Sequence, residues 1–434
     1  MLINTSSDYV PIISIQNDWE ESIKMLINTS SDYVPIISIQ NDWEESIKKP
    51  NDTAWVSSSF KDGECTQGQL TFVSVTATGT PVVRASHGFT VEAASKDTIQ
   101  IRRTNTPFMC VFLAALKTYP DIHERNIISL DVTEQGLAVS ASFDKMKVFN
   151  LRTGEVRCTL TGHVADIYKC RWFPSGEVIL SCAADMQIKI WSAENGNCAA
   201  TLVGHTRAVT DVAIIERGRN IISVSKDGYA KLWDCGKSAV ISDLTKVDSA
   251  IFCCSLSSAP TFLELGDPPS TPSEREIGTE NKILIIGCED GTVQCVAVQS
   301  RKLLLTTFTG SAVNCCTFVN SSQFIVGCQD GRILLYNLSD ATQHAWAWYD
   351  SNSPVMSLMV YKTYGFMAGH ADGICIFRSF KNKCTTRLQL TGPLCDPVYS
   401  IVSDSKFVYT STRDSVIRAY SPFSHIVKFF DEIS

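Results

Sequence analysis

Hydrophobic and polar residues alternate in short runs from about residue 130 onward, and a turn centred on an aspartate interrupts them at regular intervals. In each interval a β-type run reaches the aspartate, usually as Asp-Gly, and a second run ends in an aromatic or aliphatic residue. ISVSKDGYAKLW and IVGCQDGRILLY are examples. Alternation over about four to eight residues is typical of half-buried strands, and Asp-Gly favours a hairpin turn. The pattern therefore predicts antiparallel strand pairs that repeat along the chain.

The repeat has a nearly constant period. Its turn aspartates are Asp144, Asp185, Asp227, Asp290, Asp330, Asp372 and Asp414, which lie 40 to 42 residues apart except for one interval of 63 residues. A period of about 40 to 45 residues with four short strands per unit is the signature of a WD40 propeller blade. Gly-His pairs at 162–163 and 204–205 stand where such a blade has them. We predict an all-β fold with a seven-bladed WD40 β-propeller over residues 121–434.

Three segments depart from this repeat. The long interval contains an insertion at about 258–282, rich in Pro, Ser and Glu, which we expect to be an exposed loop of the fourth blade. Residues 49–120 contain β-type runs without a blade signature and predict a small β-rich N-terminal domain. Residues 1–24 recur unchanged at 25–48. A perfect copy indicates a recent duplication, a gene-model error or an artefact, and we expect residues 1–48 to be disordered in part.

Composition narrows the class of protein. The chain has 434 residues, of which 44% are hydrophobic and 19% are charged, as in a soluble globular protein with a large core. It has no run of about 18 apolar residues and no secretory signal pattern, so we expect no membrane contact and a cytoplasmic and nuclear location. A net charge of −7 argues weakly against a nucleic-acid partner.

Cysteine spacing argues against disulfides and metal. The 17 cysteines are spread along the chain and several lie within apolar strand-like runs, which is typical of reduced core residues. No C-x2-C or H-x3-H pair is present, and zinc sites usually take their ligands from such pairs. We therefore expect no metal.

Blades two and three carry the same four polar or half-polar residues at matched positions: His163, Ser181, Asp185 and Trp191, and His205, Ser223, Asp227 and Trp233. We expect each aspartate to accept hydrogen bonds from backbone N–H groups and from the histidine. The histidine would then orient the serine, whose hydroxyl would reach the indole N–H. A hydrolase uses similar residue types, but here the serine lies within a strand and no G-x-S-x-G elbow occurs. The sets therefore indicate structural networks without a catalytic residue.

The Gly-Lys-Ser sequence at 236–238 suggests a phosphate-binding loop at first sight. A P-loop requires a glycine five positions before this glycine, because consecutive backbone N–H groups wrap the phosphates. Position 231 is a lysine, and the segment follows a predicted third strand. We expect no nucleotide and no other cofactor.

Several stretches resemble the family of proteasomal ATPase-associated factors: FPSGEVILSCAADMQIKIWSAENG, ERGRNIISVSKDGYAKLWDCGKSA, PSEREIGTE, VNCCTF, CDPVYSI and RDSVIRAY. The resemblance covers about residues 120–421 and extends more loosely over 49–119. It implies a non-catalytic chaperone that binds the C-terminal domain of an AAA-ATPase subunit of the proteasome regulatory particle and opposes premature docking onto the 20S core. The alternatives are another WD40 scaffold, such as a substrate receptor of a ubiquitin ligase, and more remotely a propeller enzyme.

The resemblance also implies a contact through the upper face of the propeller, where acidic residues would meet basic residues of the ATPase. The acidic candidates follow a Gly-His pair, precede a turn aspartate or lie in loops that lead into blades: Asp166, Glu289, Asp248 and Asp396. Lys226 and Arg413 occupy positions equivalent to Glu289, so we expect a face of mixed charge. Ordinary solvated loop charges are the simpler interpretation of each residue. We expect the protein to act as a monomer.

Overall fold

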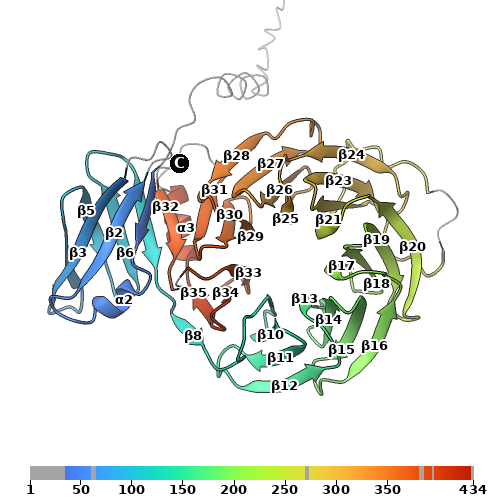
Figure 1. The fold of residues 1–434 in the computed structure, drawn as a ribbon, viewed down its shortest axis with the longest axis horizontal. Helices are drawn as coiled ribbons and strands as arrows, with labels where there is room; N and C mark the ends of the chain where they lie inside the picture. The colour runs from blue at the N-terminus through green and yellow to red at the C-terminus, as the bar shows by residue number, and fades with distance from the viewer. Residues whose placement is uncertain (1–34, 60–64, 269–272, 381–385, 393–394, 432–434) are drawn as a thin grey trace, which may run out of the picture.

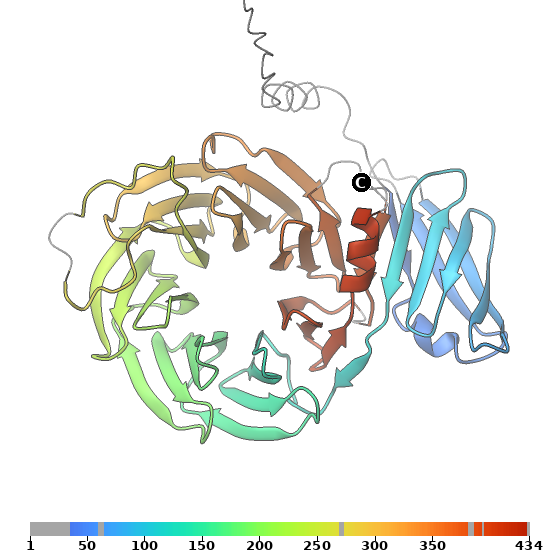
Figure 2. The same ribbon diagram turned by 180° about the vertical axis from the view of Figure 1, so that it is seen from behind.

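A computed structural model describes residues 35–59, 65–268, 273–380, 386–392 and 395–431. Seven sheets form a ring, and a smaller β domain lies beside its last two blades (Figures 1 and 2). The prediction of an all-β propeller fold is confirmed.

Each blade is a four-stranded antiparallel sheet. The first strands surround the centre of the ring: β9 (Ser129–Val132), β13 (Ile167–Trp172), β17 (Val209–Ile215), β21 (Ile251–Ser258), β25 (Val313–Asn320), β29 (Val355–Tyr361) and β33 (Val398–Ser403). The second strands are β10 (Leu137–Ser142), β14 (Val178–Ala183), β18 (Asn220–Ser225), β22 (Lys282–Cys288), β26 (Gln323–Cys328), β30 (Gly365–His370) and β34 (Val408–Thr412).

The third strands are β11 (Lys145–Asn150), β15 (Gln187–Ser192), β19 (Tyr229–Asp234), β23 (Thr292–Ala297), β27 (Arg332–Asn337), β31 (Cys375–Ser379) and β35 (Ile417–Tyr420). The outer strands are β12 (Val156–Thr161), β16 (Cys198–Val203), β20 (Ala239–Lys246), β24 (Leu303–Phe308), β28 (Trp346–Tyr349), β32 (Thr386–Leu390) and β8 (Lys117–Tyr119).

Burial explains the sequence pattern of the strands. A second strand such as β18 is buried along its whole length, because it lies inside its sheet and both faces pack against neighbouring blades. An outer strand such as β12 is mostly exposed and carries polar residues. The core consequently lies between blades, where apolar residues of two adjacent sheets share one cluster, as Ile222 and Leu284 do.

The ring is closed by a strand from before the first blade. Lys117 and Tyr119 of β8 pair with Ala419 and Ile417 of β35, so β8 is the outer strand of blade seven. The propeller therefore begins at Lys117, a few residues before the expected start at residue 121. The difference arises because the repeat-based boundary counts back from a turn aspartate and does not include this closing strand.

The N-terminal domain has two sheets that enclose one apolar core. One sheet contains β1 (Ile36–Ile39), β2 (Thr53–Ser59), β3 (Cys65–Val75) and β4 (Pro81–Ala85), and the other contains β5 (Phe89–Ala94), β6 (Thr98–Arg103) and β7 (Met109–Leu113). Helix α2 (Trp43–Ser46) connects β1 to β2. The domain thus begins before the expected residue 49, because the second copy of the duplicated segment supplies β1, α2 and the buried Trp43. The first copy lies outside the described residues.

The N-terminal domain and blade six share a sheet. Strand β7 pairs in parallel with β32, which produces one seven-stranded sheet across the two units. The outer edge of blade six is covered in this way, which prevents an unpaired strand edge. Trp43 strengthens the junction, because its indole N–H donates to Thr391 Oγ1 at 3.0 Å. Helix α3 (Phe423–Asp431) packs against blade six through a stacked Phe423–Tyr361 ring pair.

The insertion of blade four connects β21 to β22. Exposed residues such as Phe262 and Ile277 agree with the expected exposed loop, but its second half is also anchored. Asn220 accepts from the Ile277 N–H at 2.7 Å and donates to the Arg275 carbonyl at 3.0 Å. Glu276 forms an ion pair with Arg301 at 2.7 Å. Residues 269–272 of the predicted loop lie outside the described residues. In the described part of the chain, no helix has the length and apolar character needed to cross a membrane.

Candidate functional site

Blade two contains a continuous hydrogen-bonded chain from its core to its surface turn. The Trp191 indole N–H donates to Ser181 Oγ at 2.8 Å, and the Ser181 hydroxyl donates to His163 Nε2 at 2.7 Å. His163 Nδ1–H donates to Asp185 Oδ2 at 2.7 Å. Burial lowers the pKa of His163, and the neutral ring suits these donor and acceptor roles. This hydrogen-bonded network links three buried polar groups to a turn carboxylate.

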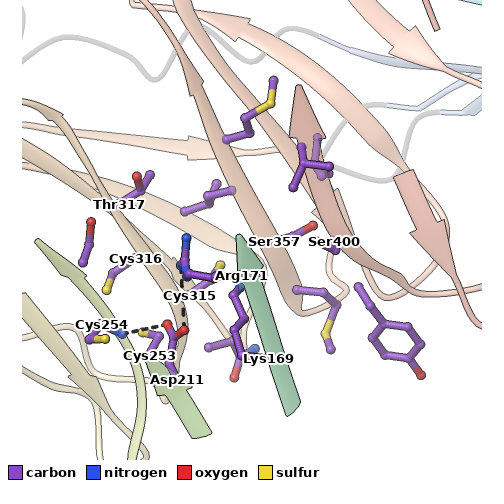
Figure 3. Close-up of a pocket in the computed structure, with 18 of the residues that line it drawn as sticks. Lys169, Arg171, Asp211, Cys253, Cys254, Cys315, Cys316, Thr317, Ser357 and Ser400 are labelled. Carbon is purple, nitrogen blue, oxygen red and sulfur yellow. Dashed lines mark hydrogen bonds and ion pairs between the residues drawn. The ribbon is translucent and has the colours of Figure 1, made fainter. Parts of the chain in front are cut away.

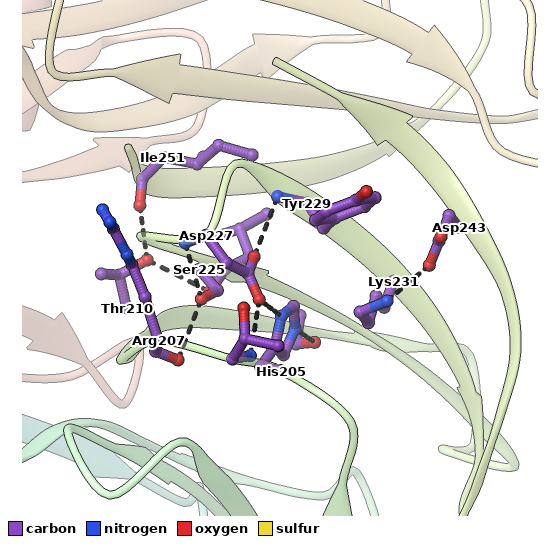
Figure 4. Close-up of polar contacts among 12 residues, drawn as sticks. His205, Arg207, Thr210, Ser225, Asp227, Tyr229, Lys231, Asp243 and Ile251 are labelled. Atoms are coloured by element: carbon purple, nitrogen blue, oxygen red, sulfur yellow. Dashed lines mark hydrogen bonds and ion pairs between the residues drawn. The ribbon is translucent and has the colours of Figure 1, made fainter. Parts of the chain in front are cut away.

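Blade three repeats this arrangement, and Figure 4 shows its outer end, where His205 and the N–H of Tyr229 contact Asp227. Trp233 donates to Ser223 at 2.7 Å, Ser223 to His205 at 2.7 Å, and His205 to Asp227 at 2.8 Å. Ser223 is fully buried within β18, and its oxygen already serves the tryptophan and the histidine. A substrate could not reach this hydroxyl, so the network is structural.

Backbone groups complete the Asp227 site. The carboxylate accepts from the N–H of Thr206 at 2.9 Å and from the N–H of Tyr229 at 3.0 Å. Burial alone would raise the pKa of Asp227, but these two bonds and the histidine outweigh burial and hold its pKa below the usual range. The ionised carboxylate is therefore part of the folded turn.

The upper face is the face that carries these aspartate turns and the loops leading into the first strands. The six predicted contact residues lie on it in separate places. Asp248 and Glu289 are exposed and close together, because the Glu289 N–H donates to the Ala250 carbonyl at 2.9 Å. Arg413 forms an ion pair with Asp396 at 2.8 Å, so these two charges neutralise each other.

The other two predicted residues lie near the centre and over blade two. The Lys226 ammonium is 5.6 Å from the ring centre of Tyr168 and 5.9 Å from that of Phe252. Asp166 is half-buried, and its carbonyl accepts from the Ala184 N–H at 2.8 Å. The expected mixture of charges is present, but the six residues do not form one continuous patch.

Sequence reasoning missed an apolar surface beside Asp166. Phe143, Val164 and Met186 are 45%, 83% and 43% exposed. They are neighbours through the backbone, since the Val164 N–H donates to Asp185 and the Phe143 carbonyl accepts from the N–H of Ile167. We call Phe143, Val164, Asp166 and Met186 the apolar upper patch.

Two residues of this patch have an unusual backbone. Phe143 and Met186 have φ angles of 54° and 66°, in the left-handed region that favours glycine. Blades three to six have glycine at the position of Met186. A large residue in this conformation costs on the order of 1–3 kcal/mol and is often found at functional sites. Methionine in place of the turn glycine was the sequence signal that could have indicated this surface.

The cysteines are thiols in the described part of the chain. Burial raises the pKa of Cys170 and of Cys295 to about 12, so both remain protonated and unreactive. Among the described residues, no three His, Cys, Asp or Glu side chains are grouped as a metal site would require.

Comparison with known proteins gives two findings. The WD40 family (WD domain, G-beta repeat) matches residues 154–192, 196–234 and 302–337. Each match begins at or just before the outer strand of one blade and ends at the third strand of the next. The sequence repeat is thus offset from the structural blade by one strand. In the same way, β8 precedes the first blade in the sequence but is the outer strand of the last blade.

The chain is also similar over most of its length to curated proteins. Proteasomal ATPase-associated factor 1 of Homo sapiens is 43% identical over 86% of this chain and 95% of that protein. The Gallus gallus protein of the same name is 42% identical over 85% of this chain and 93% of that protein. Probable proteasomal ATPase-associated factor 1 of Dictyostelium discoideum is 39% identical over 70% of this chain and 76% of that protein.

Proposed function

Because the chain belongs to the family of proteasomal ATPase-associated factors, we propose that it is a non-catalytic chaperone that binds the C-terminal domain of a proteasomal AAA-ATPase subunit. In this role it assists assembly of the 26S proteasome regulatory particle and opposes premature docking onto the 20S core. The observation that carries the proposal is the similarity along 95% of a human protein whose name records association with a proteasomal ATPase.

The apolar upper patch is the proposed centre of the contact. Val164 and Met186 offer apolar area that a partner would remove from water, which is the main source of affinity in a protein interface. Asp166 within the patch and the Asp248–Glu289 pair beside blade four would steer a basic partner surface. Asp396 contributes less, because Arg413 already pairs with it.

Closure of the ring supports a monomeric protein. All seven blades have four paired strands, and the edge of blade six is covered by β7. The outer strands of the other six blades keep a free edge, but these edges are short, as is usual for propellers. We propose that the monomer acts in the cytoplasm and the nucleus.

Charge reversal on the upper face tests the contact. Asp166→Lys and Glu289→Lys should each weaken binding to a purified ATPase C-terminal domain by about tenfold, because each puts a positive charge against a basic partner. Glu194→Lys is the matched control, since Glu194 is exposed in a loop between a third and an outer strand, on the opposite face. Titration calorimetry gives the three affinities.

A pull-down from cell extract separates the proposed role from the alternative. Recovery of free ATPase subunits without 20S core supports the chaperone. Recovery of cullin adaptors instead would favour a ubiquitin-ligase receptor. Unchanged affinity of both reversal variants would show that the upper face is not the contact.

A further inference from the structure

A cavity of about 960 Å³ runs along the axis of the propeller. The first strands of all seven blades contribute to its wall, and Figure 3 shows part of this lining. Lys226 lies at its upper end, and Lys362 lies at its lower end, just beyond β29. We call this cavity the central channel.

A repeated backbone irregularity shapes the upper mouth of the channel. In six blades the pairing register of the first strand shifts at the same position, and the residue left unpaired there lines the cavity: Tyr168, Thr210, Phe252, Asn314, Met356 and Tyr399. Such a β-bulge redirects a side chain. The mouth consequently has three aromatic rings, and the Lys226 ammonium lies over two of them, Tyr168 and Phe252.

The charge of the channel differs from that of the whole protein. The chain has a net charge of −7, yet four basic side chains and two carboxylates line this cavity. Both carboxylates already accept backbone N–H bonds. Asp211 accepts from Cys254 at 3.1 Å, and Asp131 accepts from Trp172 at 2.7 Å. They join neighbouring blades, so their oxygens are engaged in holding the ring together.

The basic side chains that blade two contributes, Lys169 and Arg171, have fewer hydrogen-bond partners than these carboxylates. Arg171 Nη2 is 3.8 Å from Asp211 Oδ1, which is too long for a hydrogen bond. Arg171 Nε is buried and has no hydrogen-bond partner among the described residues. Lys169 lines the same cavity two positions earlier on β13, so it faces the same side as Arg171. The Arg171 side chain is nevertheless 40% exposed, so the rest of its guanidinium can be reached from the cavity, and cationic donors that line a cavity suit an anionic ligand.

We propose that the central channel binds the carboxylate of an acidic peptide segment, which enters at the upper mouth and reaches Lys169 and Arg171. A guanidinium can bind a carboxylate through two parallel hydrogen bonds, and an ammonium beside it adds charge. The aromatic rings at the mouth pack against the peptide behind its carboxylate. Asp131 and Asp211 flank the cations and favour a singly charged carboxylate over a phosphate dianion.

The inference is independent of the proposed function, because the ligand is tested without any ATPase. The probe is the peptide Gly-Ser-Gly-Ser-Glu with a fluorescent N-terminal label, and fluorescence anisotropy reports its binding to the full-length protein. Three further peptides have Gln in place of Glu, an amidated C-terminus, or both changes. Comparison of the four peptides shows whether the side chain or the chain end supplies the carboxylate.

We expect the peptides that carry a carboxylate to bind and the Gln amide to bind at least about tenfold more weakly. Arg171→Met and Lys169→Met should each reduce binding by a similar factor, while Lys362→Met at the lower end should not. Two variants are needed because Arg171 could also support the fold, and thermal melting identifies any variant that fails to fold.

Three results would overturn the inference. The first is equal binding of all four peptides, and the second is full binding by a folded Lys169→Met protein. The third is displacement of the peptide by inorganic phosphate at lower concentration than by acetate, which would indicate a phosphate site.

Discussion

Blades two and three hold their turn aspartate through a buried histidine, whereas blades four to seven hold the equivalent aspartate by other means. One feature is common to six blades: a carboxylate oxygen accepts the backbone N–H two residues further on, at 2.9 to 3.2 Å, in the turns of Asp185, Asp227, Asp290, Asp330, Asp372 and Asp414. This local bond shapes the turn. The aspartate is thus required by the turn itself, with or without a histidine.

The remaining carboxylate contacts differ between the two groups. In blade three the Asp227 side chain is only 4% exposed, and His205 connects it to the core. In blade five Asp330 is 39% exposed and pairs with Arg332 at 2.6 Å. In blade seven Arg418 pairs with Asp414, but that pair is mostly buried, so Asp330 is the exposed case. Exposed ion pairs contribute about 0–1 kcal/mol, whereas buried hydrogen-bonded chains contribute more. The same residue at the same turn therefore differs in energetic weight from blade to blade.

The largest expected effect is a loss of stability at low pH, because three buried histidines of the propeller resist protonation in the folded state. Burial, and next the charge of Lys147, lower the pKa of His123 to about 4, and burial also lowers the pKa of His163 and of His205. The unfolded chain then binds protons near pH 6.5 and the folded chain does not, so the free energy of unfolding falls as the pH drops. His123 alone should account for about 2 kcal/mol between pH 7 and pH 5.

Urea unfolding at several pH values measures this loss of stability. The free energy of unfolding of His123→Gln should depend less steeply on pH. His87→Gln is the control, because His87 is exposed on the N-terminal domain. Hydrogen exchange at pH 5 should increase in β14 and β18 before β26 and β34. Equal stability at both pH values would mean that the three histidines take up protons to the same extent in the folded and the unfolded chain.

The next effect separates the two kinds of aspartate. Asp227→Ala leaves His205 and two backbone N–H groups without their acceptor, so it should cost about 1–3 kcal/mol. Asp330→Ala removes an exposed ion pair and one turn bond, and should cost about 1 kcal/mol or less. Denaturant unfolding of both variants gives the difference. Equal losses would contradict the assignment of extra stability to the histidine network.

The turns could be predicted from sequence because their chemistry is local. Asp-Gly spacing and strand alternation locate the blades, and matched positions locate the four-residue networks. The parallel pairing of β7 with β32 and the closure by β8 join segments far apart in the chain, and no local signal marks them. The apolar run MCVFL of β7 fits any buried strand.

The surface and the channel were less predictable for the same reason. The loops that carry the six charged candidates could be assigned, but the Arg413–Asp396 pair joins two different loops and depends on the folded arrangement. Lys169 and Arg171 line the channel together with Tyr168, at which the pairing of β13 with β14 shifts its register. A sequence does not reveal which residue a strand leaves unpaired. The proposed partner contacts remain predictions.

The smallest expected effect concerns the turn of blade two, which has methionine where blades three to six have glycine. Met186→Gly should stabilise the fold by about 0.5–1 kcal/mol, because relief of the left-handed strain exceeds the added freedom of the unfolded chain. The same change should weaken binding to the ATPase domain, since it removes an exposed apolar side chain of the apolar upper patch. Met186→Ala is the matched control, because it loses the side chain but keeps the strained backbone. Weaker binding in both variants with a stability gain only in the glycine variant would show that blade two retains strain to present a contact residue. Unchanged binding in both would leave the methionine without a role in that contact and shift the proposed interface toward Asp248 and Glu289.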